Sequence, residues 1–543
     1  MNKKDFNFYH GKNYSVLDTN DYGEIVFGCP PNIVKEFIKI KKPLPAKYIF
    51  PINTFQDGQN NFDFEFIVYS FLFTRAKGST VMAYCRPAQE KRFRTILHET
   101  LFGPRFDQIL AAQNHKICND KNLSKNDLKR FNDFQRSIAR NNALSSVFDR
   151  LLIDYSSESI VMRKIKQFFE DKILPEQSWL LKKNIKNLSL KLSKSYLLCA
   201  QLRKEFQLFL LAKESERNKF ISKTIKFHHL DKSGFFHIYG KNNKRKILKV
   251  QERESGVFRV FEKKIDRCLI NLNSNYPKNK KQKSKEFIIP GFGITFLGVG
   301  SGFYHDKQNS SVIIWSEKKG ILIDVVNENH TILKKYGIED KNINHIFLTH
   351  VHSDHDSGIL EKILNSQKTH IISSRIIYES FLRKAVAISA LSKKSIENFI
   401  HFIDVEPNKK IKIPGFKKTF FEFDYSLHSI PSGRCKITCI KGKQQKSIGH
   451  SGDTKFDFNK INEWYENGTF IKKRKEKIMG FIWDSDLVVH DVGGGNLHTS
   501  YDSLLDLNKL TKNKIILVHQ NEKPIPNSEL RYAVEGETIA LIK

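Results

Sequence analysis

The sequence predicts an α/β chain. Short apolar runs such as residues 346–348 and 515–518 have the length of buried strands, whereas 89–102 has the apolar spacing of a helix. The 543 residues are enough for two to four domains. The content of 40% apolar and 12% aromatic residues supports packed cores and argues against a disordered protein.

Residues 1–115 are expected to form an N-terminal α/β domain. Asn32 is a candidate helix cap there. The segment contains no phosphate-binding glycine loop and no cluster of metal-binding side chains. We therefore expect either a regulatory or dimerisation domain or a structural extension. Its predicted strands and then its predicted helices lie at 24–28, 48–51, 80–85, 32–41 and 89–102.

Three segments follow before the C-terminal half. Residues 116–225 are predicted to be mainly helical, and Leu202 and Phe206 belong to an apolar stripe that fits either a homodimer helix or core packing. Residues 226–275 alternate between polar and apolar side chains, as a small β meander would. Residues 276–286 are polar and basic and are expected to be a linker to a hydrolase domain at 287–543.

The formal net charge of +33 is typical of proteins with polyanionic partners, so nucleic acid is one candidate partner. Most of the excess is lysine, and asparagine, isoleucine and phenylalanine are also abundant, as a base-composition bias in the coding DNA would produce. Lysine is a hydrated point charge and lacks the bidentate geometry of arginine. A nucleic-acid partner is therefore not favoured.

The cysteine pattern and the absence of apolar segments indicate the compartment. Seven cysteines, with no CxxC pair, are typical of a protein in a reducing environment. The N-terminus lacks the apolar core of a secretory signal, and no apolar run is long enough to cross a bilayer. We expect a cytoplasmic protein without membrane association.

The most informative stretch is the loop at 349–355, directly after the predicted strand at 346–348. It places His350, His352, Asp354 and His355 within six residues. In an extended backbone, residues two apart project to the same side, so His350 and His352 can reach one ion. Imidazole and carboxylate ligands suit zinc, manganese or iron. The sequence therefore predicts a metal site at the end of a strand.

This loop matches the HxHxDH motif of the metallo-β-lactamase superfamily, and the resemblance extends over about residues 290–543. The segment 293–302 resembles the entry strand and glycine turn of the ribonuclease Z and phosphodiesterase branch, and 449–454 resembles its SGDT motif. The resemblance implies an αββα sandwich. The remaining motif positions are matched by Asp324, His428 and His519.

The resemblance also implies roles. It assigns His350, His352 and His428 to one metal ion, and Asp354, His355 and His519 to a second, with Asp453 bridging the two and Asp324 orienting the histidine loop. Two divalent ions, zinc, manganese or iron, would then share a hydroxide that attacks phosphorus. Asp354 would orient this nucleophile while binding metal.

His498 points to a phosphate ester as substrate. It follows a predicted strand and a glycine-rich loop, and the phosphodiesterase branch has a similar histidine before Ser or Thr that contacts the scissile phosphate and protonates the leaving group. A helix-capping histidine is the alternative. We therefore expect Asp354 and His498 to be the catalytic residues of a metal-dependent phosphodiesterase.

The favoured substrate is a 3′,5′-cyclic nucleotide, cAMP or cGMP, hydrolysed to a 5′-mononucleotide. The first alternative is a ribonuclease Z-like endonuclease acting on tRNA 3′ ends. Bacterial-type enzymes of that class insert a long tRNA-clamping arm between the positions of His428 and Asp453, which are only 25 apart here. Ser353 departs from the class II cyclic phosphodiesterase signature, which has Leu there. The second alternative is a non-catalytic sensor or scaffold, which the complete set of ligands disfavours.

Overall fold

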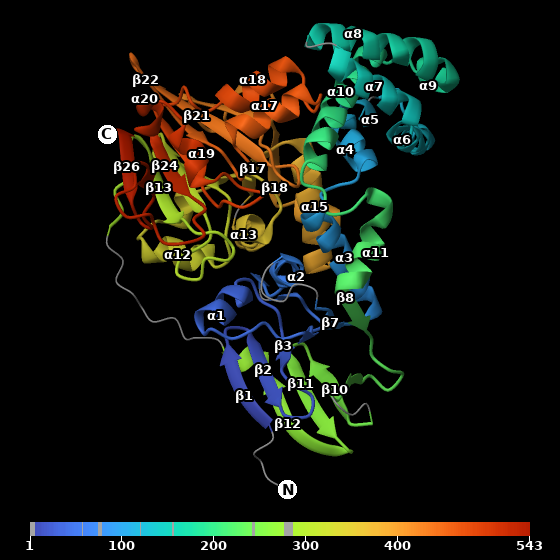
Figure 1. Cartoon of the computed structure of the whole chain (residues 1–543), viewed down its shortest axis with the longest axis vertical. Helices are drawn as coiled ribbons and strands as arrows, with labels where there is room; N and C mark the ends of the chain where they lie inside the picture. Colours follow the sequence, from blue (N-terminus) through green and yellow to red (C-terminus); the bar gives the residue numbers. More distant parts are fainter. Residues whose placement is uncertain are drawn as a thin grey trace.

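The computed structural model describes residues 6–56, 58–73, 79–119, 121–154, 157–241, 245–275, 286–366 and 368–543. The predicted basic linker at 276–286 lies outside the described residues except for Glu286. Figure 1 shows the C-terminal half, coloured yellow to red, above the N-terminal sheets, with the helical region beside it. Among the described residues, no helix combines the length and apolar character that crossing a membrane requires.

The C-terminal half contains two seven-stranded sheets. The first has the order β18-β17-β16-β15-β14-β13-β26, and the second runs from β19 to β25 in sequence order. The strands of the first sheet are β13 (Phe292–Gly298), β14 (Ser311–Ser316), β15 (Lys319–Ile323), β16 (His345–Phe347), β17 (Thr369–Ser373), β18 (Ile400–Asp404) and β26 (Thr538–Ile542). Those of the second are β19 (Lys410–Lys412), β20 (Thr419–Tyr425), β21 (Gly433–Lys441), β22 (Gln444–His450), β23 (Leu487–Asp491), β24 (Ile515–Val518) and β25 (Arg531–Tyr532).

Helices cover the outer faces of both sheets, which gives the αββα sandwich that the resemblance implies. The helices beside the first sheet are α12 (Asn329–Lys335), α13 (Ser353–Asp356), α14 (Ile359–Asn365), α15 (Arg375–Ser389) and α16 (Lys393–Glu397). Those beside the second sheet are α17 (Phe458–Glu466), α18 (Lys472–Gly480), α19 (Tyr501–Leu505) and α20 (Lys509–Lys512).

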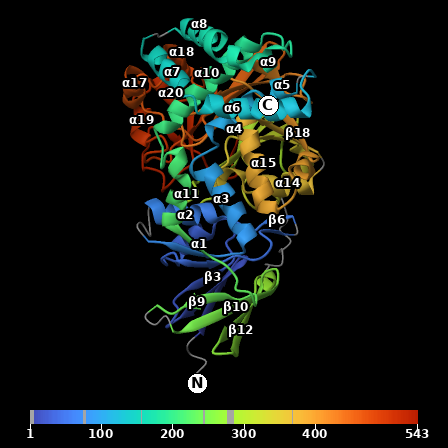
Figure 2. The same ribbon diagram turned by 90° about the vertical axis from the view of Figure 1, so that its right-hand side faces the viewer.

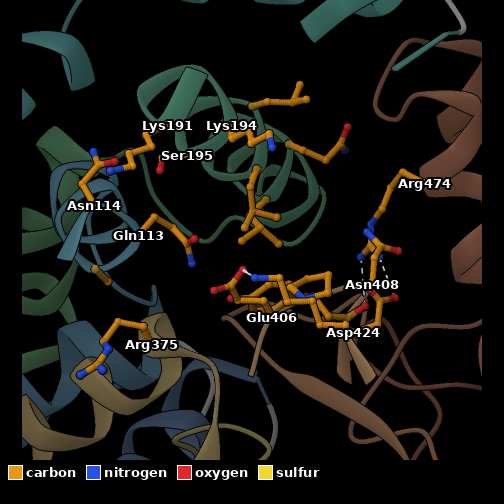
Figure 3. Close-up of a pocket in the computed structure, with 18 of the residues that line it drawn as sticks. Gln113, Asn114, Lys191, Lys194, Ser195, Arg375, Glu406, Asn408, Asp424 and Arg474 are labelled. Carbon is orange, nitrogen blue, oxygen red and sulfur yellow. Dashed lines mark hydrogen bonds and ion pairs between the residues drawn. The ribbon is translucent and has the colours of Figure 1, made fainter. Parts of the chain in front are cut away.

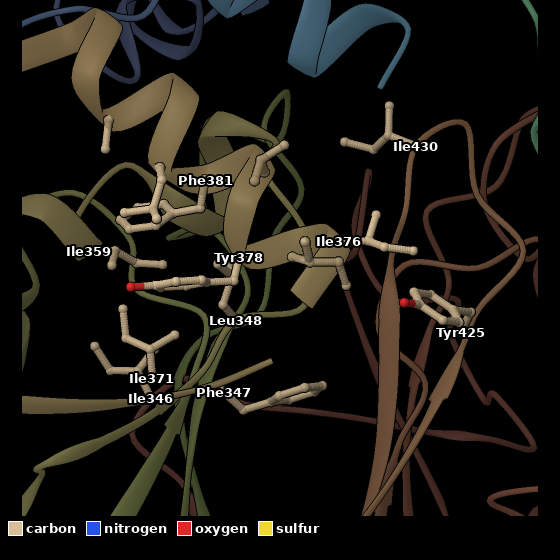
Figure 4. Packing of buried hydrophobic residues seen from close by; sticks show 14 of the residues in the cluster. Ile346, Phe347, Leu348, Ile359, Ile371, Ile376, Tyr378, Phe381, Tyr425 and Ile430 are labelled. Atoms are coloured by element: carbon tan, nitrogen blue, oxygen red, sulfur yellow. The ribbon is translucent and has the colours of Figure 1, made fainter. Parts of the chain in front are cut away.

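Strand β16 is buried on both faces, and the residues after His345 are apolar. Figure 4 shows Ile346 and Leu348 on the side of Tyr378 from α15, whereas Phe347 points towards the second sheet. The ring of Phe347 lies 5.1 Å from that of Phe421, edge to face. This packing fixes the end of β16, from which the predicted metal-binding loop emerges.

The N-terminal part also contains two main sheets, whose orders are β1-β2-β3-β4-β7-β8 and β12-β11-β10-β9. The strands of the first are β1 (Phe6–Gly11), β2 (Tyr14–Thr19), β3 (Ile25–Phe27), β4 (Lys47–Ile49), β7 (Val81–Tyr84) and β8 (Ile225–His228). Those of the second are β9 (Phe236–Tyr239), β10 (Ile247–Glu254), β11 (Val257–Glu262) and β12 (Ile265–Asn271), and a short hairpin is formed by β5 (Phe55–Gln56) and β6 (Gln59–Asn60). Three helices accompany them, α1 (Ile33–Lys39), α2 (Phe64–Phe73) and α3 (Pro87–Leu101).

The structure differs from the predicted division of residues 1–275. Strand β8 pairs in parallel with β7 and so completes the N-terminal sheet, although 226–275 was expected to stand apart. The two N-terminal sheets share a core, in which the rings of Phe27 and Phe258 are 5.2 Å apart. The division at 225 therefore does not mark a separate unit, because the chain returns to the sheet edge there. Asn32 precedes α1 as expected, but its side chain makes no cap hydrogen bond.

The helical region is an insertion between α3 and β8, and Figure 2 shows it above the N-terminal sheets. Leu202 and Phe206 of its longest helix, α10, are buried, so these members of the predicted stripe pack inside the molecule. The helices are α4 (Phe106–Gln113), α5 (His115–Cys118), α6 (Lys125–Ala139), α7 (Asn142–Asp154), α8 (Glu158–Phe168), α9 (Ser178–Leu181), α10 (Leu188–Gln207) and α11 (Arg217–Thr224).

Candidate metal centre and substrate cavity

The predicted ligands lie together at one edge of the sandwich. Each follows a strand, so the loops at the strand ends meet there, and all seven are buried. The histidine loop follows β16, His428 follows β20, and Asp453 follows β22. His519 follows β24 with a φ of 57°, a left-handed conformation that is uncommon outside glycine.

The first predicted trio forms a compact group of imidazoles. His352 Nδ1 lies 3.1 Å from His350 Nε2 and 3.2 Å from His428 Nε2. Three ring nitrogens facing one point are the donor set of a divalent transition metal.

The second predicted trio lies beside the first. Asp354 Oδ2 is 3.2 Å from His519 Nε2 and 3.6 Å from His355 Nε2. Asp453 Oδ2 lies between the groups, 3.7 Å from His350 Nε2 and 3.2 Å from His355 Nε2. This is where a carboxylate shared by two metal ions would lie.

Each of these histidines can bind a metal through one ring nitrogen if its other ring nitrogen carries the proton, so the partners of that other nitrogen show whether the rings fit a metal. The Nε2–H of His352 donates to the carbonyl of Thr100 at 3.0 Å, and the Nδ1 of His428 faces the carbonyl of Leu497 at 3.4 Å. Each bond leaves the inner nitrogen unprotonated. His355 Nε2 is buried without a hydrogen-bond partner. The residues therefore fit two cations.

Asp324 occupies the orienting position that the sequence predicts. Its carboxylate accepts hydrogen bonds from the backbone N–H of Thr349 at 2.9 Å and from His355 Nδ1 at 2.7 Å. The hydroxyl of Thr349 also donates to Asp324 and lies 2.9 Å from His350 Nδ1. One carboxylate thus orients rings from both groups.

Burial and charge act differently on the two groups of rings. Burial, reinforced by neighbouring imidazoles, holds the pKa of His350 and His352 well below the usual value. Burial lowers the pKa of His428 to about 4. Burial also opposes the charged form of His519, but Asp453, Asp354 and Asp491 raise its pKa to about 10. The first group is therefore neutral at pH 7, and the second lies in a negative field that attracts cations.

His498 lies at the same edge, and the structure adds Asp491, which the sequence analysis did not assign. His498 Nδ1 is 3.0 Å from Asp491 Oδ2 and 3.7 Å from Asp453 Oδ2. Asp491 Oδ1 also lies 3.4 Å from His519 Nδ1. The sequence could have suggested Asp491 as a site residue through its position, because it ends β23 directly before the glycine-rich loop.

A cavity of about 980 Å³ opens onto these residues. Asp354, Asp453 and His498 lie on its wall together with Gly302 and Phe303. The other wall comes from α2, from α3, and from the end of α10 with the segment that follows it. It includes Phe66, Tyr69, Leu72, Phe73, Leu101 and residues 207–211. The N-terminal part therefore contributes directly to the site, which no motif in the sequence indicated.

A second cavity of about 530 Å³ contains none of the predicted metal ligands. It lies where α10 meets the C-terminal half, and Figure 3 shows Lys191 and Lys194 of α10 across from Glu406 and Asp424. Arg474 contacts Glu205 of α10 at 2.7 Å and Asp424 of β20 at 2.9 Å. These ion pairs hold the helical region against the C-terminal half.

Comparisons with known proteins agree with the motifs. Residues 292–536 match the family model described as anti-Pycsar protein Apyc1. The cAMP/cGMP-dependent 3′,5′-cAMP/cGMP phosphodiesterase B of Dictyostelium discoideum is 37% identical over 268 residues, which cover 49% of this chain and 24% of the relative. The cGMP-dependent 3′,5′-cGMP phosphodiesterase A of the same organism is 34% identical over 254 residues, which cover 47% and 28%. The chain spans about a quarter of the length of these relatives.

Among solved structures, this chain matches YhfI from Bacillus subtilis with 14% identity and a TM-score of 0.34 over 46% of this chain and 99% of that one. Unliganded yeast PDE1 has 13% identity and a TM-score of 0.33 over 47% and 100%. A long-form RNase Z from yeast has 10% identity and a TM-score of 0.46 over 98% and 97%. The C-terminal half has the metallo-β-lactamase fold that its motifs predict, and it is related in sequence to the Dictyostelium phosphodiesterases.

Proposed function

We propose that this protein is a metal-dependent phosphodiesterase that hydrolyses 3′,5′-cyclic nucleotides, cAMP or cGMP, to 5′-mononucleotides. The position of Asp453 between two histidine groups carries the proposal, because a shared carboxylate is typical of two-metal phosphoryl chemistry. The names of the Dictyostelium relatives support the substrate class. The residues aligned with the Apyc1 model include all seven predicted ligands.

The ligand roles follow the two groups of side chains. His350, His352 and His428 would hold one cation, and Asp354, His355 and His519 a second, with Asp453 shared between them. Two such cations supply an activated water molecule and neutralise charge on the phosphoryl oxygens. Zinc, manganese and iron all accept this donor set.

The chain itself supplies the positioning. Asp354 Oδ2, the oxygen that faces His519, also accepts a hydrogen bond from the backbone N–H of Gly302 at 3.0 Å, so this carboxylate is fixed at the cavity wall. Asp354 would thereby orient the attacking water towards the substrate.

We assign the proton transfer to His498. Its Nδ1 faces Asp491, which leaves Nε2 for a proton that can pass to the leaving 3′-oxygen. Lys455 Nζ donates to the carbonyls of Gly495 at 2.7 Å and His498 at 3.0 Å, which holds the glycine-rich loop in place. His498 is about one-fifth exposed, so it can reach a ligand in the cavity.

A tRNA 3′-end endonuclease is the second candidate function, and the charge of +33 favours it. Strands β21 and β22 are joined by residues 442–443 alone, so the interval between His428 and Asp453 has no room for a tRNA-clamping arm. The cavity volume is within the range of small-molecule sites. Both observations favour the cyclic nucleotide.

The test is turnover of the purified full chain with manganese or zinc. Conversion of cAMP or cGMP to the 5′-mononucleotide, abolished by EDTA and restored by metal, is the expected result. Cleavage of a precursor tRNA without cyclic-nucleotide turnover would replace the proposal with the endonuclease.

A further inference from the structure

The first sheet of the N-terminal part has the same strand pairings as six of the seven strands in the first sheet of the C-terminal half, and β26 has no counterpart among the described residues. Strands β1, β2 and β3 are antiparallel, and β3, β4, β7 and β8 are parallel. Strands β13, β14 and β15 are antiparallel in the same way, and β15, β16, β17 and β18 are parallel. Helices also correspond, since α1, α2 and α3 occupy the same intervals as α12, α14 and α15.

The second sheets extend this correspondence. Strands β9 to β12 form a consecutive antiparallel sheet, as do β19 to β22. The equivalent helices α3 and α15 lie side by side in Figures 1 and 2. Glu99 of α3 accepts hydrogen bonds from Arg383 and Ser380 of α15. The N-terminal part therefore repeats most of the C-terminal architecture, without counterparts of β23 to β26 among the described residues, and this N-terminal copy packs against the C-terminal one through equivalent helices.

The N-terminal copy lacks the metal-binding loop. The residues after β4, Phe50-Pro51-Ile52-Asn53-Thr54, occupy the position of the histidine loop after β16 and contain no histidine. Among the described residues, every cluster of potential metal ligands belongs to the C-terminal copy. Within the described part of the chain, only the C-terminal copy brings potential metal ligands together.

We propose that the N-terminal copy is a non-catalytic partner built into the chain, and that Tyr69 and Glu65 of its helix α2 are positioning residues for the metal-binding loop. The hydroxyl of Tyr69 lies 3.0 Å from His352 Nε2 and donates to the carbonyl of Thr100 at 3.1 Å. That carbonyl accepts the Nε2–H of His352. Both contacts fix the ring so that its Nδ1 faces His350 and His428.

Glu65 holds the neighbouring residue of the loop. Its carboxylate accepts hydrogen bonds from the backbone N–H of Ser353 at 3.1 Å and from its hydroxyl at 2.9 Å. Lys384 donates to the hydroxyl of Ser353 and to Asp356, and lies 3.7 Å from Glu65. Ser353 is the residue that departs from the cyclic phosphodiesterase signature. Its contact with Glu65 gives this departure a physical reason, because leucine could not make the side-chain bond.

Phe66, also on α2, supports the second group of ligands. Its ring lies against Gly302, where a Cβ atom would be 2.1 Å from the ring. The N–H of Gly302 donates to Asp354 Oδ2, so α2 contacts the backbone that holds this carboxylate. One helix of the N-terminal copy thus reaches both halves of the proposed metal centre and one wall of the cavity.

Metal affinity of the full chain tests this inference, measured by competition with a zinc chelator. Tyr69 and Glu65 are inferred to affect the binding of the cation. Only the consequence for cyclic-nucleotide hydrolysis rests on the proposed function. Tyr69→Phe removes the hydroxyl that contacts His352 and Thr100, and zinc affinity should fall about tenfold at an unchanged melting temperature. Tyr48→Phe is the matched control, because Tyr48 is buried in the same copy and its hydroxyl has no hydrogen-bond partner. Equal zinc affinities in these two variants would overturn the proposal.

A double-mutant cycle tests the second contact independently. Glu65→Ala and Ser353→Ala should each weaken zinc binding. Because both remove the same contact, the double variant should bind zinc as well as the single variant with the lower affinity. Strictly additive losses would contradict a direct positioning role. If zinc affinity responds as expected while cyclic nucleotides are not hydrolysed, the proposed function fails and this inference stands.

Discussion

Asp491 Oδ2 lies 3.0 Å from His498 Nδ1, and the two side chains form a pair at the edge of the proposed metal centre. This contact fixes the orientation of the His498 ring. The contact therefore links His498, which the sequence predicts as a catalytic residue, to Asp491, which the sequence analysis did not assign.

Replacing His498 should impair chemistry without releasing metal. His498→Ala removes the proposed proton donor, and kcat for cAMP should fall by about 10² to 10⁴. The metal content, measured by atomic emission, should stay at the native level because His498 is not a proposed ligand. Asp491→Asn should lower kcat less, since the ring remains. Native kcat in His498→Ala would remove the proton-transfer role.

Replacing the shared carboxylate should remove both metal and activity. Asp453→Ala deletes the oxygen that lies near ligands of both groups, so bound metal and turnover should fall together. His352→Ala should act in the same way. His401→Ala is the control, because His401 is an exposed residue of β18, outside the cavity. Full turnover in Asp453→Ala would exclude the two-cation account.

His345 gives the stability of the fold a dependence on pH. Burial, assisted by His370 stacked 4.4 Å away, lowers the pKa of His345 to about 4. An unfolded histidine titrates near 6.5, so between pH 6.5 and 4 the unfolded state binds the extra proton. The free energy of unfolding should therefore fall as pH decreases through this window, by on the order of 2–3 kcal/mol from this group.

Urea unfolding of chelator-treated protein at pH 6.5 and pH 4.5 measures this effect. His345→Gln has no group to protonate, so its stability should decrease less over the same interval. An identical decrease in native protein and variant would assign the pH dependence to other groups.

Strand β16, which precedes the proposed metal-binding loop, should be sensitive to cavity formation. Phe347 is fully buried between the sheets, and Phe347→Ala should lower the free energy of unfolding by about 3–5 kcal/mol. Phe399→Ala is the control, because Phe399 is 38% exposed and its truncation should cost less than about 1 kcal/mol. Similar losses in both variants would show that β16 does not depend on this packing.

The sequence predicted which C-terminal side chains lie together, because the proposed ligands belong to short motifs at strand ends. His350, His352 and Asp354 share one loop, and His428 and His519 each follow an apolar strand. Asp491 was missed because a single acidic residue at a strand end has many structural explanations. Its role becomes visible only through its contacts with His498 and His519.

The N-terminal part was harder to predict because its role depends on tertiary contacts. Helix α2 is buried on nearly all sides, so residues 64–73 lack the amphipathic spacing that marks a helix. Tyr69 and His352 are 283 positions apart, and no local pattern connects them. Strand β8 joins its sheet after a helical insertion of about 120 residues, which local patterns interpret as a new unit.

Turnover of the purified chain with manganese or zinc tests the central claim most directly, with cAMP, cGMP and a precursor tRNA offered in parallel. The account predicts release of a 5′-mononucleotide from cAMP or cGMP, its loss in Asp453→Ala, and little cleavage of the tRNA. Cleavage of the tRNA alone, or no metal-dependent turnover of any of the three substrates, would contradict it.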